Sequence, residues 1–289
     1  MIGTLRAALN VMRRAPRLAT WPAVRRTGFF IPYENAPISR AGGYPALEPI
    51  FAAARPAFLD VIAAGAAYKA DLERIARGGP GLVGERPARF GQEWFPRLDA
   101  VAAYTLVRGS RPRRIIEIGS GHSTRFLAQA IVDGGLATDL TCIDPRPRAP
   151  LAGLPLRHQA RRFGAADEAA AASLGPGDIL FIDSSHVAMP GTEVDRLLLD
   201  VLPRLGAGVL VHLHDIFLPD PYPAAWMRRG YNEQIVVGAL LQGGAYDLVF
   251  ASRYVATRTD LLAGSLIADL PLSAAAFEAS LWLRKRSAR

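Results

Sequence analysis

The sequence IIEIGSGHST occupies residues 115–124 and joins an apolar run to a glycine-rich turn. The run has the β-branched composition of a strand, and Gly119 and Gly121 let the backbone turn sharply. We expect a helix to follow, because Ser123 and Thr124 are residue types that cap helix N-termini. A helix start offers unpaired N–H groups and a partial positive charge. The segment therefore predicts a strand–turn–helix unit that receives a nucleotide-like ligand.

Short strand-like runs alternate with helical patterns after this segment. The further runs are DLTCID, PLRHQA, DILFID, GVLVHLHD, YDLVFAS and ASLWLRK, and the expected helices span residues 123–133, 165–174, 193–205 and 232–241. Strands that alternate with helices indicate an α/β fold in which helices cover both faces of a mostly parallel sheet. Runs that are apolar throughout fit such a doubly covered sheet.

The part of the chain before the sheet region has a different pattern. Residues 46–77 predict an amphipathic helix pair, or one helix bent near Pro56. A Gly/Pro loop follows over residues 78–89, and then a short helix through Leu106. We expect an N-terminal arm and helical extension over residues 1–105 and the ligand-binding domain over residues 106–289.

The first thirty residues or so are rich in arginine and contain no acid before Glu34. This is typical of a solvated arm that packs on the main domain or on a partner subunit of a homo-oligomer. A transit peptide and a membrane-surface helix are the alternatives. Phe29, Phe30 and Tyr33 are expected to form part of a lid.

Composition narrows the class of protein. The single cysteine, Cys142, excludes an internal disulfide and a Cys-based zinc site, and we interpret it as a core thiol. The net charge of +8 invites a nucleic-acid partner, but the arginines are scattered without aromatic interleaving, which argues against one. No apolar run reaches the length of a membrane span, and no signal-peptide pattern is present. We expect a cytoplasmic protein and leave peripheral membrane contact open.

Two details of the glycine turn separate the possible ligands. The third glycine of the dinucleotide pattern GxGxxG is absent, because Thr124 stands there. Glu117 precedes the first glycine, and a carboxylate there suits a ligand that carries a cation, such as the amino group of S-adenosylmethionine (SAM), better than it suits a pyrophosphate. Asp144 ends the second expected strand, where a carboxylate can accept both ribose hydroxyls. The alternative for Asp144 is a turn residue before Pro145.

The order ExGxG, an acid at the end of the next strand and then GDILFID resembles the class I SAM-dependent methyltransferases from about residue 112 onward. The strings IIEIGSGHSTRF, GDILFIDSSHV and VHLHDIFLP resemble a bacterial branch of O-methyltransferases acting on small molecules or glycans. The resemblance implies a doubly wound, Rossmann-like sheet of seven strands, the last of them antiparallel and inserted beside its neighbour. It implies SAM across the carboxyl ends of the first strands, near Glu117, Gly119, Ser120, Gly121, Ser123, Asp144 and Asp183.

Polar side chains end the fourth and fifth expected strands. Asp183 and His186 follow the fourth strand, and His214 and Asp215 end the fifth. Carboxyl ends of neighbouring parallel strands meet at one edge of a sheet, so we expect these four side chains to lie close together. Strand alternation puts His212 on the same side as His214, and we interpret His212 as a buried structural histidine.

This cluster suits methyl transfer to a hydroxyl, which must lose its proton. One route uses His186 or His214, with Asp215, as a general base. Another uses a divalent ion that lowers the hydroxyl pKa. Metal-dependent O-methyltransferases of the catechol type, and those acting on macrolide sugars, resemble this arrangement, which implies Asp183, His214 and Asp215 as ligands and His186 as base. His214 departs from the usual oxygen ligand, so Mg²⁺ and softer ions such as Mn²⁺, Fe²⁺ or Zn²⁺ stay open, as does a structural role in capping loops.

The stretch IFLPDPYPAAWMRRGYNEQ, residues 216–234, predicts a long loop over the site. Its candidates for contact with the acceptor are Tyr222, Trp226, Arg228, Arg229 and Tyr231, and the alternative is a packed cover with solvent-facing arginines. Glu233 is expected to cap the next helix or to join the polar cluster. The arginines favour an anionic acceptor.

The sequence therefore favours a SAM-dependent O-methyltransferase that acts on a hydroxyl of a small molecule or glycan. A catalytically silent SAM-binding protein and a nicotinamide-dependent oxidoreductase are the alternatives.

Overall fold

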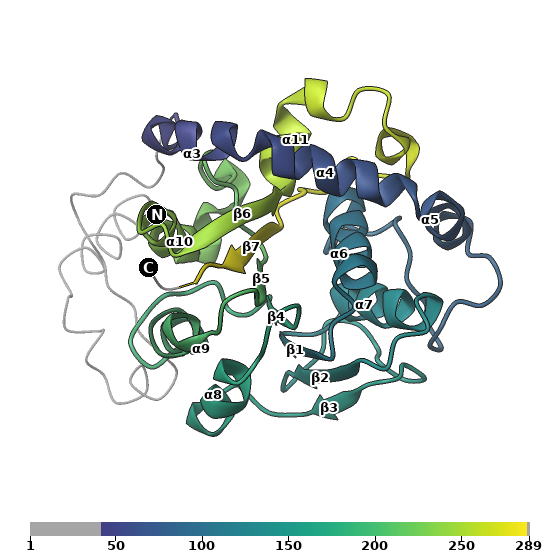
Figure 1. Ribbon diagram of the computed structural model, residues 1–289, viewed down its shortest axis with the longest axis horizontal. Coiled ribbons are helices and arrows are strands. Elements are labelled where there is room, and N and C mark those ends of the chain that lie inside the picture. Colours follow the sequence, from purple (N-terminus) through teal and green to yellow (C-terminus); the bar gives the residue numbers. More distant parts are fainter. Residues whose placement is uncertain (1–41, 288–289) are drawn as a thin grey trace, which may run out of the picture. The chain divides into compact units, whose positions relative to one another are not determined.

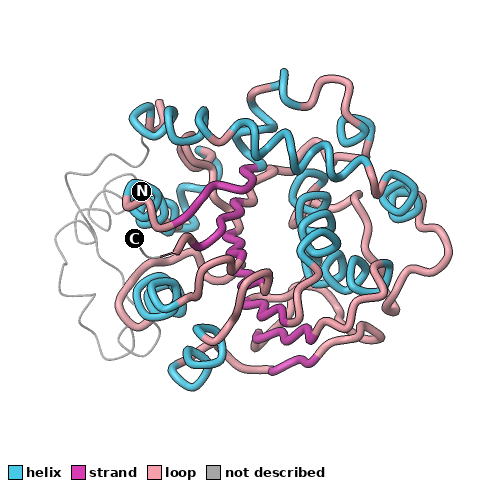
Figure 2. Tube along the Cα trace, in the orientation of Figure 1, coloured by secondary structure: helices cyan, strands magenta, loops and turns pink. Residues whose placement is uncertain are grey.

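The computed structural model describes residues 42–287, apart from the side chains of residues 227, 228, 259 and 266. The expectations for the arginine-rich arm and for Phe29, Phe30 and Tyr33 concern residues outside this range. The described chain is built around one twisted sheet with helices on either side of it (Figure 2).

The sheet has seven strands in the order β3-β2-β1-β4-β5-β7-β6. All neighbours pair in parallel except β7, which runs antiparallel between β5 and β6. The predicted insertion of the last strand is thus confirmed. The strands are β1 Arg114–Ile118, β2 Asp139–Ile143, β3 Arg157–Gln159, β4 Ile179–Ile182, β5 Leu210–Leu213, β6 Tyr246–Ala251 and β7 Leu281–Lys285.

The strand order reverses at β1, so the crossovers leave this strand in opposite directions. Parallel sheets bind ligands outside the carboxyl ends of the strands at such a switch point. The turn after β1 and the residue after β4 are consequently the places to look for a ligand site.

The helices form a layer on each face of the sheet (Figure 1). One layer contains α4 Arg55–Ala66, α6 Arg97–Ser110 and α7 His122–Asp133, and the other contains α8 Ala165–Ala172, α9 Glu193–Arg196 and α10 Glu233–Gln242. The remaining α-helices are α3 Glu48–Ala53, α5 Lys69–Ala76 and α11 Ser252–Thr257. Short 3₁₀ turns are η2 Pro45–Leu47, η4 Leu202–Arg204, η5 Ala224–Arg229, η6 Thr259–Leu261 and η7 Leu266–Asp269.

Three helical predictions need correction. The region 46–77 holds three helices, because α3 ends at Ala53 and α4 begins anew with Pro56 in its first turn. The helix expected over 193–205 changes into a π-helical turn, Leu197–Val201, and then a 3₁₀ turn, since Pro203 has no N–H to continue an α-helix. The short helix before the sheet is α6, which runs on to Ser110. The domain boundary proposed after residue 105 lies inside this helix.

A continuous apolar core joins the sheet to its helices. On one side Phe58 of α4 packs edge-on against Phe250 of β6, with ring centroids 6.1 Å apart, and against Tyr254 at 5.7 Å. All three side chains are buried, and losing one large aromatic side chain from such a core costs about 3–5 kcal/mol. The helical extension is therefore packed onto the sheet.

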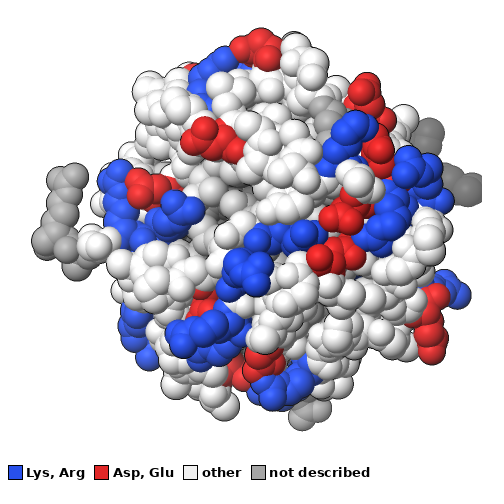
Figure 3. All heavy atoms as spheres, turned by 45° about the vertical axis from the view of Figure 1, so that its right-hand side comes forward, with Lys and Arg blue, Asp and Glu red and all other residues white. Residues whose placement is uncertain are grey.

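On the face drawn in Figure 3, basic and acidic side chains are interspersed, and no broad single-sign area forms there. No single helix in residues 42–287 is long and apolar enough to cross a membrane, and only the bent pair Pro45–Ala53 and Arg55–Ala66 meets that test jointly.

Candidate active site

The turn after β1 depends on a glycine at residue 119. Gly119 has φ 82°, in the left-handed region that favours glycine, and a Cβ there would stand 1.7 Å from the carbonyl oxygen of Asp183. The chain segments that follow β1 and β4 therefore touch at this residue. The absent side chain is what lets the glycine turn and Asp183 meet at one edge of the sheet.

Glu117 supports this turn from behind. Its fully buried carboxylate accepts hydrogen bonds from the Ser123 and Thr124 hydroxyls, both at 2.7 Å, and from the Cys142 thiol at 3.1 Å. Burial raises the pKa of Glu117 to about 7, although the three hydrogen bonds act in the opposite direction. Its contact with an amino group of the ligand stays a prediction.

The predicted N-cap of α7 is wrong. Gly121 holds that position, and Ser123 and Thr124 lie inside the first turn of the helix. The Thr124 hydroxyl accepts the Gly121 N–H at 2.8 Å and donates to Glu117, so it links the helix start to β1. Both hydroxyls donate hydrogen bonds to a buried carboxylate, and the sequence pattern of a helix cap does not predict this contact.

Asp144 has the turn role that was considered as its alternative, and its contact with a ribose stays a prediction. Its Oδ2 accepts the N–H of Ser120 and its Oδ1 that of Arg146, both at 2.7 Å, as in a turn. Each oxygen keeps a free lone pair, and the residue is only half-buried. The nearby Ser120 Oγ is buried and has no hydrogen-bond partner within the described chain.

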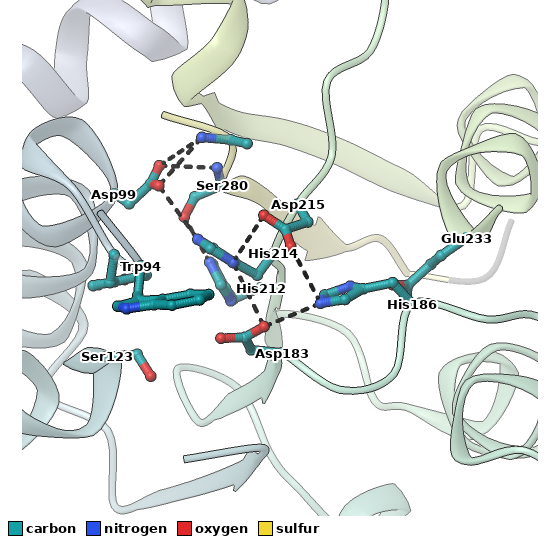
Figure 4. A network of polar contacts seen from close by, with 12 residues as sticks. Trp94, Asp99, Ser123, Asp183, His186, His212, His214, Asp215, Glu233 and Ser280 are labelled. Carbon is teal, nitrogen blue, oxygen red and sulfur yellow. Dashed lines mark hydrogen bonds and ion pairs between the residues drawn. The ribbon is translucent and has the colours of Figure 1, made fainter. Parts of the chain in front are cut away.

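The structure brings together the four side chains that end β4 and β5 (Figure 4). Nε2 of His186 lies 3.3 Å from Oδ1 of Asp183 and 3.4 Å from Oδ2 of Asp215. Nδ1 of His214 lies 3.5 Å from the same oxygen of Asp183 and 3.4 Å from Oδ1 of Asp215. We call these four residues the His–Asp cluster.

Two buried carboxylates hold the imidazoles from outside this cluster. Oε2 of Glu233 lies 3.0 Å from Nδ1 of His186, and Oδ2 of Asp99 lies 3.3 Å from Nε2 of His214. Asp99 also accepts the N–H of Ser280 at 2.9 Å, which fixes its own position. Sequence reasoning missed Asp99, although it is the one acid in α6 and lies on that helix's buried side.

The carboxylates dominate the electrostatics of the His–Asp cluster. Burial by itself would lower the pKa of His186 and of His214, but the surrounding carboxylates raise both well above the usual range. Burial raises the pKa of Asp215, whereas the two histidines hold the pKa of Asp183 well below its usual value against the effect of burial. The surrounding carboxylates therefore favour the protonated form of both imidazoles.

The backbone of the cluster is unusual. His186 has φ 58° and Asp215 has φ 54°, both in the left-handed region that non-glycine residues rarely adopt. Such conformations persist where the surrounding structure holds them, and they gather at functional sites.

His212 is buried, as expected. Its ring stacks on Phe181 with centroids 3.7 Å apart, and Nε2 lies 2.8 Å from the Ser280 hydroxyl. Burial lowers its pKa well below the usual range, so the ring is neutral. This histidine belongs to the core.

The predicted metal ligands Asp183, His214 and Asp215 are neighbours but do not form a cation site. Within residues 42–287, no group of three or more His, Cys, Asp or Glu side chains is arranged to hold a metal ion. Each ring nitrogen of His186 and His214 faces a carboxylate instead. The residues as placed do not fit a divalent ion.

The loop between β5 and α10 contributes one direct neighbour of the cluster. The ring of Tyr231 lies 4.6 Å from that of His186, centroid to centroid. Trp226 packs edge-on against Tyr231 at 5.9 Å, and the Arg229 guanidinium lies 3.8 Å from the Trp226 ring centre. Tyr222 is turned inward, where its hydroxyl accepts the N–H of Gln234 at 3.3 Å. The stacked side chains form one wall beside His186.

Comparison with known proteins finds a family model and several solved structures that are similar to this chain. Residues 116–216 match the family model described as "Methyltransferase domain". The solved structures that resemble the chain include apo CmcI (16% identity, TM-score 0.38, covering 66% of this chain and 71% of CmcI) and S-adenosylhomocysteine (SAH)-bound PaMTH1 of Podospora anserina (16%, 0.41, 90% and 100%). A third is the plantazolicin methyltransferase BamL, in complex with a substrate analogue and SAH (12%, 0.39, 82% and 100%). No curated protein matches the chain.

The matched segment runs from β1 to the residue after the His–Asp cluster, and so contains the glycine turn, Asp144 and Asp183. The match covers about a third of the chain, residues 116–216 of 289.

Proposed function

We propose that this protein is a class I SAM-dependent methyltransferase that modifies a hydroxyl oxygen of a small molecule or glycan, and that the His–Asp cluster receives the hydroxyl proton. The observation that carries the proposal is the pair of buried imidazoles, His186 and His214, each held at one ring nitrogen by a buried carboxylate. This is the arrangement of an oriented general base. A methyl acceptor that lacks a proton to lose would have no use for it.

The cofactor residues have distinct roles in the proposal. Asp144 and Ser120 would hold SAM through the free lone pairs and the buried hydroxyl described above, while Gly119 and Gly121 keep the turn free of side chains. Glu117 would hold the turn in shape through Ser123. When bound, SAM supplies an electrophilic methyl group on a good leaving group, so the protein needs to align the acceptor and take its proton.

The orienting carboxylates decide which ring nitrogen can act. Glu233 engages Nδ1 of His186, which leaves Nε2 on the side of Asp183 and Asp215. Asp99 engages Nε2 of His214, which leaves Nδ1 on that same side. Both of these nitrogens face Asp183 and Asp215, and an acceptor hydroxyl would lie beside them.

A histidine takes a proton only from its neutral state, whereas the carboxylates here favour the charged imidazolium. A cationic ligand bound at this edge of the sheet would lower the histidine pKa again, because a nearby like charge disfavours the protonated form. The base would therefore become competent when the positively charged methyl donor is present.

The metal-assisted route is the second mechanism to test. It would use Mg²⁺ or another divalent ion at Asp183, His214 and Asp215, and these side chains do not fit an ion as they are placed. We expect methyl transfer to persist after EDTA treatment. Activity that vanishes with EDTA and returns with one added divalent ion would favour the metal route.

Binding and transfer test the proposal in two steps. SAH should raise the melting temperature of the wild type by mass action, and Asp144→Ala should lose that shift while staying folded. Transfer of a labelled methyl group to a panel of hydroxyl compounds should then occur with the wild type and fall about a hundredfold in His186→Asn or His214→Asn. Absence of any SAH shift at millimolar ligand would refute SAM binding, and an NAD-dependent shift would favour an oxidoreductase. SAH binding with no transfer across the panel would favour a silent SAM-binding protein.

A further inference from the structure

A second group of charged side chains lies beside the glycine turn and takes no part in the proton transfer proposed above. We call it the arginine cluster. Two members come from the loop before α6, two from the first turns of α7 and one from the loop after β2: Arg86, Arg89, His122, Arg125 and Arg148.

Packing contacts fasten these three segments to one another. The ring of Phe90, next to Arg89, lies 5.2 Å from that of Phe126 in α7, centroid to centroid. The N–H of Arg148 donates to the carbonyl oxygen of Ser120 in the glycine turn at 2.9 Å. The arginine cluster is thus built into the same edge of the sheet as the proposed SAM site.

Arg125 is the unusual member of the cluster. Its side chain is only 3% exposed, yet it forms a single hydrogen bond, to the carbonyl oxygen of Pro150 at 3.1 Å, and its buried Nε has no partner in the described chain. Burial, together with Arg89 and Arg86, lowers its pKa. By contrast Arg97 of α6, also largely buried, forms a two-point ion pair with Glu278. Burying a charge without a counter-charge costs free energy, so an anion bound beside Arg125 would stabilise it.

The rest of the cluster supplies no such anion. Among residues 42–287, none of its four arginines forms an ion pair with a carboxylate. Burial and the neighbouring Arg125, Arg89 and Arg148 lower the pKa of His122 to about 4, so this ring is neutral at physiological pH. The cluster is a positive site around a neutral hydrogen-bonding ring.

Two consecutive residues connect this positive site to the His–Asp cluster. The Arg148 guanidinium lies 4.0 Å from the ring centre of Trp94, which is 46% exposed. The next residue, Phe95, packs on His214 with ring centroids 5.4 Å apart. Figure 4 shows Trp94 on the side of the His–Asp cluster where Ser123 of α7 also lies. Trp94 and Phe95 therefore join the arginine cluster to the His–Asp cluster through consecutive contacts.

We propose that the arginine cluster binds a carboxylate or phosphate group of the methyl acceptor, so that the substrate is an anionic hydroxyl compound. This inference rests on the proposed function. Guanidinium groups bind both anions through paired hydrogen bonds, and Arg125 would gain the counter-charge that the protein does not give it. The amino-acid carboxylate of SAM has the same chemistry, so the experiment must separate the two sources.

The test uses inorganic phosphate as the probe and the full chain saturated with SAH. The melting temperature is followed during a phosphate titration and compared with sodium chloride at equal ionic strength. The variant is Arg89→Ala/Arg148→Ala, which removes two exposed members and spares the buried Arg125. The matched control is Arg113→Ala/Arg284→Ala, which removes two exposed arginines elsewhere and changes the net charge equally.

Phosphate should raise the melting temperature of the wild type and of the control even with SAH bound. The variant should need about tenfold more phosphate for the same rise, because it lacks charge-assisted hydrogen bonds. The inference is overturned if the wild type shows no phosphate-specific rise, if the control loses as much as the variant, or if the rise occurs only without SAH. That last result would assign the cluster to the SAM carboxylate.

Paired acceptors then test the substrate itself. One such pair is 4-hydroxybenzoate and phenol, and another is any acceptor found in the panel together with its uncharged analogue. The KM for the anionic member should be about tenfold higher in the variant than in the wild type, and kcat should be nearly unchanged. An equal effect on both members would contradict the inference. The phosphate titration does not depend on methyl transfer, so its outcome stands apart from that of the proposed function.

Discussion

Replacing Glu117 by Gln should change how the stability of this protein depends on pH. Glu117 is fully buried and its pKa lies at about 7, mainly because burial disfavours its charged form. The unfolded chain releases this proton near the usual value of 4.5, whereas the folded chain keeps it until about 7. Between these values the native state holds one more proton than the unfolded state, so stability falls as pH rises.

The size of the effect follows from the two pKa values. The difference of about 2.5 pKa units corresponds to about 3 kcal/mol of unfolding free energy at 1.36 kcal/mol per unit. Most of this stability is lost between about pH 5 and about pH 8. Gln cannot ionise, so Glu117→Gln loses this pH-dependent penalty. The variant should be less stable than the wild type at the acidic end by about 1 kcal/mol, since an amide NH₂ replaces one acceptor of the Thr124 hydroxyl. At the alkaline end it should be the more stable protein.

Urea unfolding of the wild type and of Glu117→Gln at about pH 5 and about pH 8 tests this reversal in their order of stability. Only the difference between wild type and variant is used, so that the histidines, which titrate in both, cancel. Glu85→Gln is the control, because Glu85 lies in solvent. Wild-type and Glu117→Gln stabilities that move in parallel with pH would show that Glu117 does not titrate near neutrality and would refute this reasoning.

The remaining predictions concern the glycine turn and the base. Gly119→Ala should abolish folding or lower the free energy of unfolding in urea by more than about 4 kcal/mol, because its Cβ would overlap the Asp183 carbonyl at a residue with positive φ. A stable Gly119→Ala protein would contradict this close approach. The pH profile of kcat should rise with pH through a limb set by the histidine pKa in the SAM-bound enzyme, and a flat profile would exclude a histidine base. If His214 is the base, Asp99→Asn should move that limb toward lower pH by about one unit, because the ring loses a neighbouring carboxylate. If His186 is the base, Glu233→Gln should have the same effect. A limb that moves in neither variant would show that neither carboxylate positions the base.

Much of the fold could be predicted from the order of elements along the chain. Strand-like runs alternating with helical patterns leave few arrangements for an α/β sheet, and all seven strands occur where those runs stand. Sequence order also placed Asp183 and His214 at one edge, because the carboxyl ends of parallel strands must meet. Helix limits were less well predicted, as the π-helical turn after α9 shows, since they depend on packing as much as on local pattern.

Partners distant in sequence could not be predicted. Asp99 lies far along the chain from His214, and nothing in α6 marks its carboxylate as the one that reaches β5. Ser123 and Thr124 have the composition of helix caps, yet tertiary packing places them against a buried Glu117.

The glycine turn, the two strand-end acids and the paired histidines are local features, and the sequence by itself determined that they meet at one edge of the sheet. Only the tertiary structure decided the direction of the histidine pKa shifts and, within the described chain, the isolation of Arg125 from a carboxylate. Burial and the distances between charges set both properties, and they exist only once the chain has folded.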